Sequence, residues 1–240
     1  MELSGATIVT VPPALSQESI TRFSANLHSA LTDPTSHAVV MQGGAETFCR
    51  GLDIGRSCEE SIRPALETFA ACLESIRLGN KPVVGLVQGA AAAGGVGLAA
   101  ACDALLATTE ATFTLTELLF GLTPAIIYPY LAQRLGPQKL RWMALSSQTL
   151  TAHDALHAGL VDFVCPADKA PIVLRSWVRR LQRVQPDAVA LWKRMTAEPA
   201  ALCPTQGVQK TLERLHDPGV RAALLDFSET GRLPWRGGGA

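Results

Sequence analysis

The feature that most constrains this chain is an uncharged run of 21 residues, 82–102, in which seven are alanine and five are glycine. The run is long enough to span a bilayer, but it holds so few large apolar side chains that its insertion would be weak. Small side chains allow chain segments to approach one another closely. We therefore expect this run to form the tightly packed core of a soluble fold, with no membrane span.

The pattern around this run predicts alternating strands and helices. Apolar residues at Ile20, Phe23, Leu27 and Leu31 share one helical face, and Ser16 stands where a helix cap would be. Predicted strands are 6–11, 37–41, 82–87 and 104–108, and predicted helices are 16–31, 59–78 and 94–102. Such alternation is typical of an α/β fold with a parallel sheet and crossover helices.

The pattern changes after residue 116, where helices with short breaks are predicted. A helix start is expected at Thr151, with Asp154 favourable to the helix dipole. Three or four amphipathic helices are expected within 169–227, separated by prolines. We therefore predict a core at 1–165 that holds the functional site, and a helical region at 166–240 that packs on the core or on a neighbouring subunit.

Composition excludes several classes of function. The chain has 240 residues, 48% of them hydrophobic, and its 21 basic and 21 acidic residues give no formal net charge. This length is ample for a hydrophobic core, and neutrality argues against nucleic-acid or membrane binding through the overall field. The six cysteines form no CxxC pair, the N-terminus shows no signal-peptide pattern, and no metal-ligand cluster or GxxxxGK loop is present. A cytoplasmic protein with reduced thiols and no metal is expected.

Three segments are candidates for chemistry. In the first, a strand enters a turn of small residues and a helix begins near Gly94, so that bare N–H groups can bind a carbonyl or an oxyanion. In the second, Gly51 follows a strand and can expose the N–H of Leu52. Close packing explains the first segment equally well, and an ordinary turn explains the second.

The third segment contains Glu117, the only acidic residue between Glu110 and Asp154. Its neighbours Leu115 and Leu118 would desolvate the carboxylate and raise its proton affinity, as suits a general acid or base. The structural alternative for a glutamate at a helix start is a cap.

Together these segments resemble the crotonase (enoyl-CoA hydratase/isomerase) superfamily over nearly the whole chain. The matching pieces are VVMQGGAETFCRGLDI, NKPVVGLVQGAAAAGGVGLAAACDALLAT, ATFTLTELLFGLTP, RLGPQKLRWMALSSQTLTAHDALHAGLVDFV and the helical tail. The resemblance implies a crotonase-like (ββα) superhelix core with a C-terminal helical trimerisation region, and a homotrimer or dimer of trimers. It also implies an oxyanion hole for a thioester carbonyl, formed by the backbone N–H groups of Leu52 and Gly94.

The chain departs from the hydratase pattern in two places. Glu117 matches one of the two glutamates that hydratases of this family carry, but the other falls at Gly97 and is absent. Bulky residues 125–130 replace the usual glycine-rich stretch. With the tail FSETGRLPW, these features resemble the dehydratases of polyketide β-branching cassettes. That resemblance implies dehydration of a 3-hydroxy-3-methylglutaryl group to the 3-methylglutaconyl thioester, carried by phosphopantetheine on an acyl carrier protein, or by coenzyme A.

Other roles are left open. Arg50 or Tyr128 is a candidate partner for the distal carboxylate of the substrate, although Arg50 also fits a solvated charge or a contact to pantetheine. Asp53 is expected to brace its loop, and a substrate-binding or catalytic role for its side chain is left open. Possible contacts for an acidic carrier protein, or ordinary solvated charges, are Arg56, Arg134, Lys139 and Arg141. The alternative functions are a decarboxylase or isomerase acting on an acyl carrier protein or coenzyme A thioester, and an inactive scaffold with the same fold.

Overall fold

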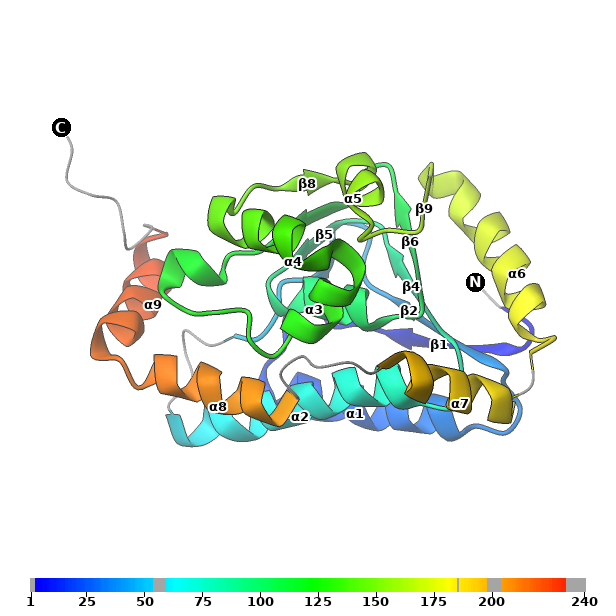
Figure 1. Ribbon diagram of the computed structural model, residues 1–240, viewed down its shortest axis with the longest axis horizontal. Helices are drawn as coiled ribbons and strands as arrows, with labels where there is room; N and C mark the ends of the chain where they lie inside the picture. Colours follow the sequence, from blue (N-terminus) through cyan, green and yellow to red (C-terminus); the bar gives the residue numbers. More distant parts are fainter. Residues whose placement is uncertain (1–2, 54–58, 185, 198–203, 232–240) are drawn as a thin grey trace.

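The computed structural model describes residues 3–53, 59–184, 186–197 and 204–231 (Figure 1). Its centre is a parallel sheet in the order β1-β2-β4-β6-β9. The strands of this sheet are β1 (Ala6–Thr10), β2 (Ala38–Gln42), β4 (Val83–Val87), β6 (Ala104–Thr108) and β9 (Phe163–Cys165). Most of their side chains are buried, as a parallel sheet covered on both faces requires. The predicted parallel sheet is confirmed.

A second sheet of short strands follows the carboxyl ends of the first. Its order is β3-β5-β7-β8, with β3, β5 and β7 parallel and β8 antiparallel to β7. Its strands are β3 (Thr47–Cys49), β5 (Ala90–Ala92), β7 (Thr112–Thr114) and β8 (Leu150–Thr151). Each of the first three comes after a long strand and before a helical segment, which gives the repeated ββα turn that the resemblance implied.

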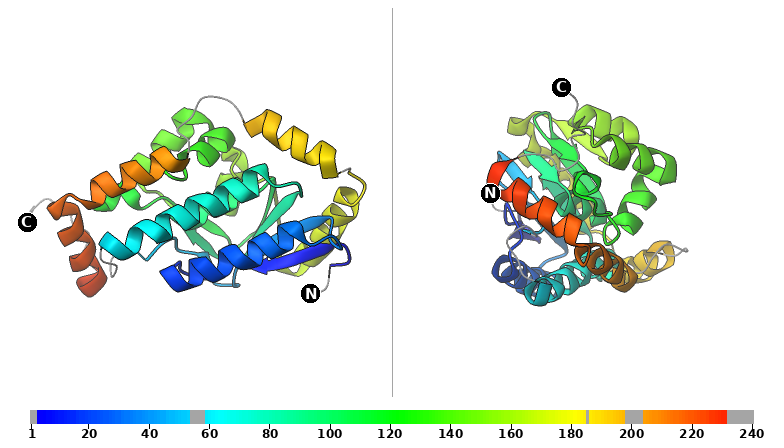
Figure 2. Two further views of the ribbon diagram at one scale, coloured as in Figure 1. Left: turned by 90° about the horizontal axis from the view of Figure 1, so that it is seen from below. Right: turned by 90° about the vertical axis from the view of Figure 1, so that its left-hand side faces the viewer.

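Helices enclose the two sheets. In chain order the α-helices are α1 (Gln17–Thr32), α2 (Glu59–Leu78), α3 (Gly94–Ala101), α4 (Tyr128–Ser146), α5 (Ala152–Ala158), α6 (Ala170–Leu181), α7 (Pro186–Ala197), α8 (Pro204–Leu215) and α9 (Pro218–Thr230). Short 3-10 helices are η1 (Glu117–Phe120) and η2 (Ala167–Lys169). Helices α1 and α2 lie side by side, and α7 and α8 pack against α2 (Figures 1 and 2).

Helix starts agree with the sequence predictions where a capping residue was recognisable. Ser16 caps α1 and Thr151 caps α5, each through a reciprocal pair of hydrogen bonds with the third helical residue. The predicted helix 59–78 is confirmed at both ends. Helix α4 differs from a regular helix because Gly136, at φ 71°, and Pro137 kink it.

Buried side chains form two clusters on opposite sides of the large sheet. One joins the two sheets to α1–α4 and includes Val208, Leu212, Leu215 and Val220 from α8 and α9. The other lies under α6, where Leu174 and Val178 pack on the sheet. The described part of the C-terminal region therefore shares the core of residues 1–165. Its packing on neighbouring subunits stays a prediction.

Candidate active site

The first candidate segment has the geometry of an exposed donor. Helix α3 begins at Gly94, and the preceding residue, Ala93, has φ 48° and ψ −123°, a conformation that L residues rarely adopt. The Ala93 N–H donates to the Thr114 oxygen at 2.9 Å, which ties this turn to β7. The N–H of Gly94 donates no hydrogen bond to any described residue. This turn therefore presents an unpaired donor at a helix N-terminus.

The second candidate segment is held by the chain before α1. The N–H of Leu15 donates to the Gly51 oxygen at 2.9 Å, and the N–H of Asp53 donates to the Leu15 oxygen at 3.0 Å. Because successive residues of an extended chain point their N–H groups in opposite directions, the Leu52 N–H faces away from Leu15. It donates to no residue of the described chain.

Gly51 brings these two segments together. Its φ of 86° favours glycine, and a Cβ built there would lie 2.8 Å from the Gly94 nitrogen. A side chain at this position would be strained and would crowd the donor at the start of α3. The glycine is therefore required by a close approach as well as by its backbone conformation.

The three predicted segments meet at one cavity of about 70 Å³. Leu52, Gly94 and Glu117 all line it. The other lining residues are Leu66, Phe69, Ala93, Leu122, Thr123, Pro124, Ala125, Ile126, Ile127 and Thr211. The residues that carry the two donors and the carboxylate thus line a cavity whose other walls are almost entirely apolar.

Glu117 is the only titratable residue among those described along this cavity. It begins η1, whose end is fixed by the Leu122 N–H donating to the Glu117 oxygen at 3.0 Å. Its Oε2 is buried and has no hydrogen-bond partner among the described residues. Burial raises the pKa of Glu117 from 4.5 to about 7, against a smaller lowering by the N–H groups of Glu117 and Thr116. A carboxyl group with this pKa can both accept and release a proton near neutral pH.

The two departures from the hydratase pattern are parts of one packing arrangement. A Cβ built at Gly97 would lie 2.0 Å from Cγ2 of Ile127 and 2.6 Å from its Cβ. Ile127 is buried and lines the cavity, whereas Gly97 does not. Ile127 therefore fills the space that a side chain at position 97 would need, and the wall there is apolar.

The three residues expected to bind substrate lie outside this cavity. Arg50 and Asp53 are exposed, and neither lines the cavity. Tyr128 begins α4 and packs, partly buried, against the core, again outside the cavity lining. The backbone bond from Asp53 to Leu15 agrees with the expected bracing of its loop. The roles of these three side chains stay predictions.

Some lining residues were not identified from the sequence. Thr211 lies on α8 and Phe69 on α2, far from Glu117 along the chain. Each stands in an amphipathic helix, and its periodicity indicates only that the helix has a buried face. Tertiary packing of α2 and α8 brings these side chains to the cavity.

The prediction that Arg134 contacts a carrier protein is wrong. Its side chain is only 12% exposed, and its guanidinium donates to the oxygens of Ala100, Cys102 and Leu160 and to Asp162. The carbonyl groups near the end of α3 need donors, and Arg134 supplies them. Lys139 donates to two carbonyl oxygens at the end of α5 but is exposed, as is Arg141. Arg56 lies outside the described residues.

The repeated ββα turns and the cavity at the start of α3 define a crotonase-fold enzyme. Residues 10–238 match the family described as enoyl-CoA hydratase/isomerase, and the chain belongs to this family. It is therefore an enzyme of the enoyl-CoA hydratase type, a carbon–oxygen lyase.

The chain is similar to known proteins over most of its length. The bacillaene synthase dehydratase PksH of Bacillus subtilis (strain 168) is 29% identical over 214 residues, covering 84% of this chain and 80% of its own. The mevalonyl-coenzyme A hydratase sidH of Aspergillus fumigatus is 29% identical over 220 residues, covering 85% and 80%. The crystal structure of the PksH enoyl-CoA hydratase from B. subtilis superposes with a TM-score of 0.82 at 23% identity, covering 94% of each chain.

Neither a cluster of metal ligands nor a membrane-spanning helix is found among the described residues. Within these ranges, no group of three or more His, Cys, Asp or Glu side chains is placed to hold a metal ion. None of the described helices is both long and apolar enough to cross a membrane.

Proposed function

We propose that this enzyme dehydrates a 3-hydroxy-3-methylglutaryl thioester on an acyl carrier protein to the 3-methylglutaconyl thioester, in polyketide β-branching. The observation that carries the proposal is one cavity lined by Glu117, whose Oε2 has no partner among the described residues, and by Leu52 and Gly94, whose N–H groups donate to no described residue. The similarity to a dehydratase of bacillaene synthase supports the polyketide setting. The phosphopantetheine arm of the carrier, or coenzyme A, would deliver the acyl group.

The two donors would stabilise the negative charge that makes this reaction difficult. Removing the proton on the carbon next to the thioester places negative charge on the carbonyl oxygen. The N–H groups of Leu52 and Gly94 would donate to this oxygen, and each donor of such a hole contributes about 3 kcal/mol to stabilising the charge. Because the bridge to Leu15 and the Ala93 turn already fix both donors, little reorganisation is needed during the reaction.

Glu117 would move the proton. Its carboxylate takes the α proton as the C–H bond breaks and the enolate forms. The enolate then re-forms the carbonyl, the C–O bond at the β carbon breaks, and Glu117 returns a proton to the departing hydroxyl, which leaves as water. The carboxylate is regenerated, so one group suffices for elimination on one face of the acyl chain. No second carboxylate lines the described cavity.

The apolar wall supports a β-branched substrate. Ile126 and Ile127 stand where the hydratase pattern has a carboxylate and a glycine-rich stretch, and they offer contact to a methyl group. A mevalonyl group, named for the Aspergillus relative, likewise bears a hydroxyl and a methyl on one carbon. Arg50 or Tyr128 would bind the distal carboxylate. The active assembly would be a homotrimer or a dimer of trimers, with α6–α9 at its interfaces.

Intact mass spectrometry tests the proposal. A carrier protein loaded with 3-hydroxy-3-methylglutaryl is incubated with the wild type, with Glu117→Gln, and with a known dehydratase as positive control. The proposal predicts loss of one water with the wild type and no change with Glu117→Gln. No mass change with the wild type, while the control enzyme works, would overturn the substrate assignment. Loss of carbon dioxide from a carrier loaded directly with 3-methylglutaconyl, with no loss of water from the hydroxyacyl carrier, would instead indicate a decarboxylase.

A further inference from the structure

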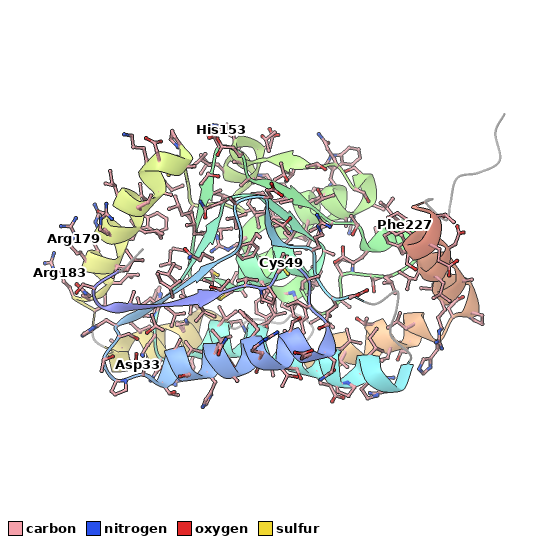
Figure 3. All side chains as sticks on the ribbon, turned by 180° about the vertical axis from the view of Figure 1, so that it is seen from behind. Asp33, Cys49, His153, Arg179, Arg183 and Phe227 are labelled. Atoms are coloured by element: carbon pink, nitrogen blue, oxygen red, sulfur yellow. The ribbon has the colours of Figure 1, made fainter. Side chains whose placement is uncertain are left out.

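Helix α9 contacts the short segment that carries Glu117. The rings of Phe227 on α9 and Phe120 on η1 pack edge to face, with centroids 4.7 Å apart and planes at 65°. Figure 1 shows α9 beside this segment, and Figure 3 places Phe227 where the two meet. About a hundred residues of chain separate the two rings, so this contact exists only in the folded C-terminal region.

A second contact between the C-terminal region and the cavity is made by helix α8. Thr211 on α8 is 6% exposed and lines the cavity, and Leu212 and Leu215 beside it belong to the main core. The Asp217 carboxylate accepts hydrogen bonds from the N–H groups of Gly219 and Val220, which caps α9 directly after α8 ends. Core packing of α8 and the cap of α9 therefore fix where Phe227 stands.

The segment that carries Glu117 has little internal support. A 3-10 helix of four residues has poor hydrogen-bond geometry, and none of the four residues of η1 is fully buried. Its position therefore depends on neighbours, which are α4 and α9. Burial of the Glu117 carboxyl group depends on this position, and small displacements of a catalytic group reduce rates strongly.

We propose that Phe227 is a positioning residue, which acts through Phe120 to hold the Glu117 carboxyl group in the largely apolar cavity. The inference rests on the acid–base role of Glu117 but not on the identity of the acyl group. Charge from the packed helices does not account for the environment of Glu117. The titratable residues of α9 and α4 are Arg221, Asp226, Glu229, Tyr128, Tyr130, Arg134, Lys139 and Arg141, and none of them lines the cavity.

The test compares Phe227→Ala with Phe227→Tyr, which keeps the ring, and with Phe163→Ala. The last variant removes another edge-to-face pair, Phe163 with Trp177, on β9 and α6. We expect Phe227→Ala to lower kcat about tenfold with KM changed less than twofold, because a small displacement of a catalytic group slows the reaction without removing a contact to the substrate. The pH midpoint of its activity should fall from about 7 toward 4.5 as water reaches the carboxyl group. Phe227→Tyr and Phe163→Ala should keep both values.

Two outcomes would overturn the proposal. One is an unchanged kcat in Phe227→Ala. The other is a loss of activity that follows only the folded fraction, with the midpoint unchanged, which would make Phe227 a stabilising residue alone. If the wild type turns over no thioester, the proposed function fails, but the carboxyl midpoint can still be read by ¹³C NMR in each variant, with Glu117→Gln identifying the signal. An identical midpoint in the wild type and Phe227→Ala would then reject the positioning role.

Discussion

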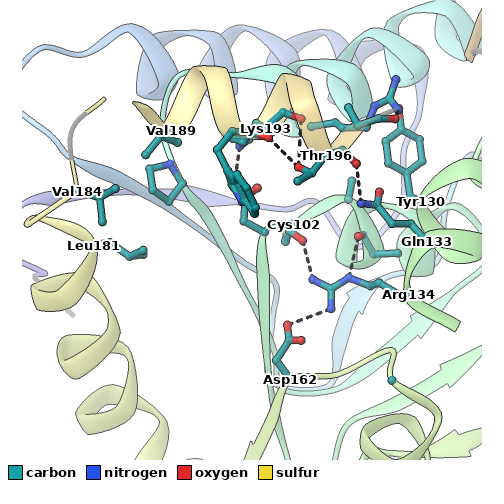
Figure 4. Close-up of a pocket in the computed structure, with 18 of the residues that line it drawn as sticks. Cys102, Tyr130, Gln133, Arg134, Asp162, Leu181, Val184, Val189, Lys193 and Thr196 are labelled. Atoms are coloured by element: carbon teal, nitrogen blue, oxygen red, sulfur yellow. Dashed lines mark hydrogen bonds and ion pairs between the residues drawn. The ribbon is translucent and has the colours of Figure 1, made fainter. Parts of the chain in front are cut away.

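Two hollows in the described part of the chain differ in how their charged groups are paired. The active-site cavity is small, about 70 Å³, and holds one carboxylate whose Oε2 has no partner among the described residues. The other hollow is a groove of about 870 Å³ between the core, α6 and α7 (Figure 4). In the groove, Lys193 contacts Asp103 at 2.6 Å and Arg134 contacts Asp162 at 3.0 Å.

The two hollows differ in whether their charged side chains have hydrogen-bond and ion-pair partners. In the groove, Lys193 also donates to the Lys81 oxygen, and Arg134 donates to three carbonyl oxygens, so each cation is satisfied by several acceptors. Burial raises the pKa of Asp103, while the Lys193 ammonium opposes that rise. These groups hold α7 and α4 to the core. The larger hollow is thus a structural junction, whereas the carboxyl group in the smaller one has an oxygen, Oε2, without a partner among the described residues.

The largest expected effect is the loss of activity in Glu117→Gln. The amide cannot accept the α proton, so kcat should fall by at least about a thousandfold while the fold is kept. Steady-state kinetics with the same thioester measures this loss. Glu110→Gln, which alters an exposed glutamate on the turn before β7, is the matched control and should retain wild-type rates. Activity near the wild-type level in Glu117→Gln would refute the assignment of this carboxylate.

A substitution in the groove should lower the stability of the protein and leave its reaction rate nearly unchanged. Lys193→Met leaves Asp103, whose side chain is 33% exposed, without its cation, and solvent screening reduces the expected loss of unfolding free energy to about 1–3 kcal/mol. The rate per folded molecule should change little, because Lys193 does not line the active-site cavity. Denaturant unfolding and kinetics on the same sample measure both quantities. A tenfold loss of kcat in fully folded Lys193→Met would connect the groove to the chemistry.

Stability should depend on pH through Glu117. Its pKa is about 7 in the folded protein and near 4.5 when unfolded. Between these values the folded protein retains a proton that the unfolded chain has released, so the unfolding free energy falls as pH rises. The decrease attributable to Glu117 is at most about 3 kcal/mol.

Glu117→Gln should remove this contribution. The variant should therefore be more stable than the wild type at about pH 8, with the difference shrinking toward about pH 4. Urea unfolding of both proteins across this range gives the difference directly. A stability difference that does not change with pH would show that the carboxyl group is not desolvated in the folded protein.

The smallest effect tests the packing of Gly97 against Ile127. In Gly97→Ala the new methyl overlaps Ile127, which should cost about 1–3 kcal/mol of stability. Combining it with Ile127→Ala should cost less than the sum of the two single changes, because the second change opens the space that the first needs. Denaturant unfolding of the four proteins completes the cycle. Strictly additive losses would mean that the two positions do not share one space.

Much of the fold could be predicted because it is encoded in patterns of adequate length. The 20 residues of α2 show clear helical periodicity, and the caps at Ser16 and Thr151 satisfy local hydrogen bonds. The strands of the second sheet were implied only by the family resemblance, since strands of two or three residues are too short to show an alternating pattern. Strand β9 was missed for the same reason.

Some residues of the candidate site could likewise be predicted from the sequence, and others could not. Gly51, Gly94 and Glu117 lie in motifs that could be recognised, and the structure brings their segments to one cavity. Thr211 and the groove network of Arg134 could not be foreseen, because their partners are distant in the chain and depend on how α8 and α4 pack. Recognition of the motif at Gly97 showed what was missing, but only the packing of Ile127 shows what replaced it.

We propose that one desolvated carboxylate, whose Oε2 has no partner among the described residues, performs both proton transfers. The most direct test is the pH dependence of kcat/KM for dehydration by the wild type. Because Glu117 must be ionised to accept the α proton, kcat/KM should rise with pH through a midpoint of about 7 and then level off. A midpoint near 4.5, or a rate that does not vary between about pH 5 and pH 8, would contradict the claim.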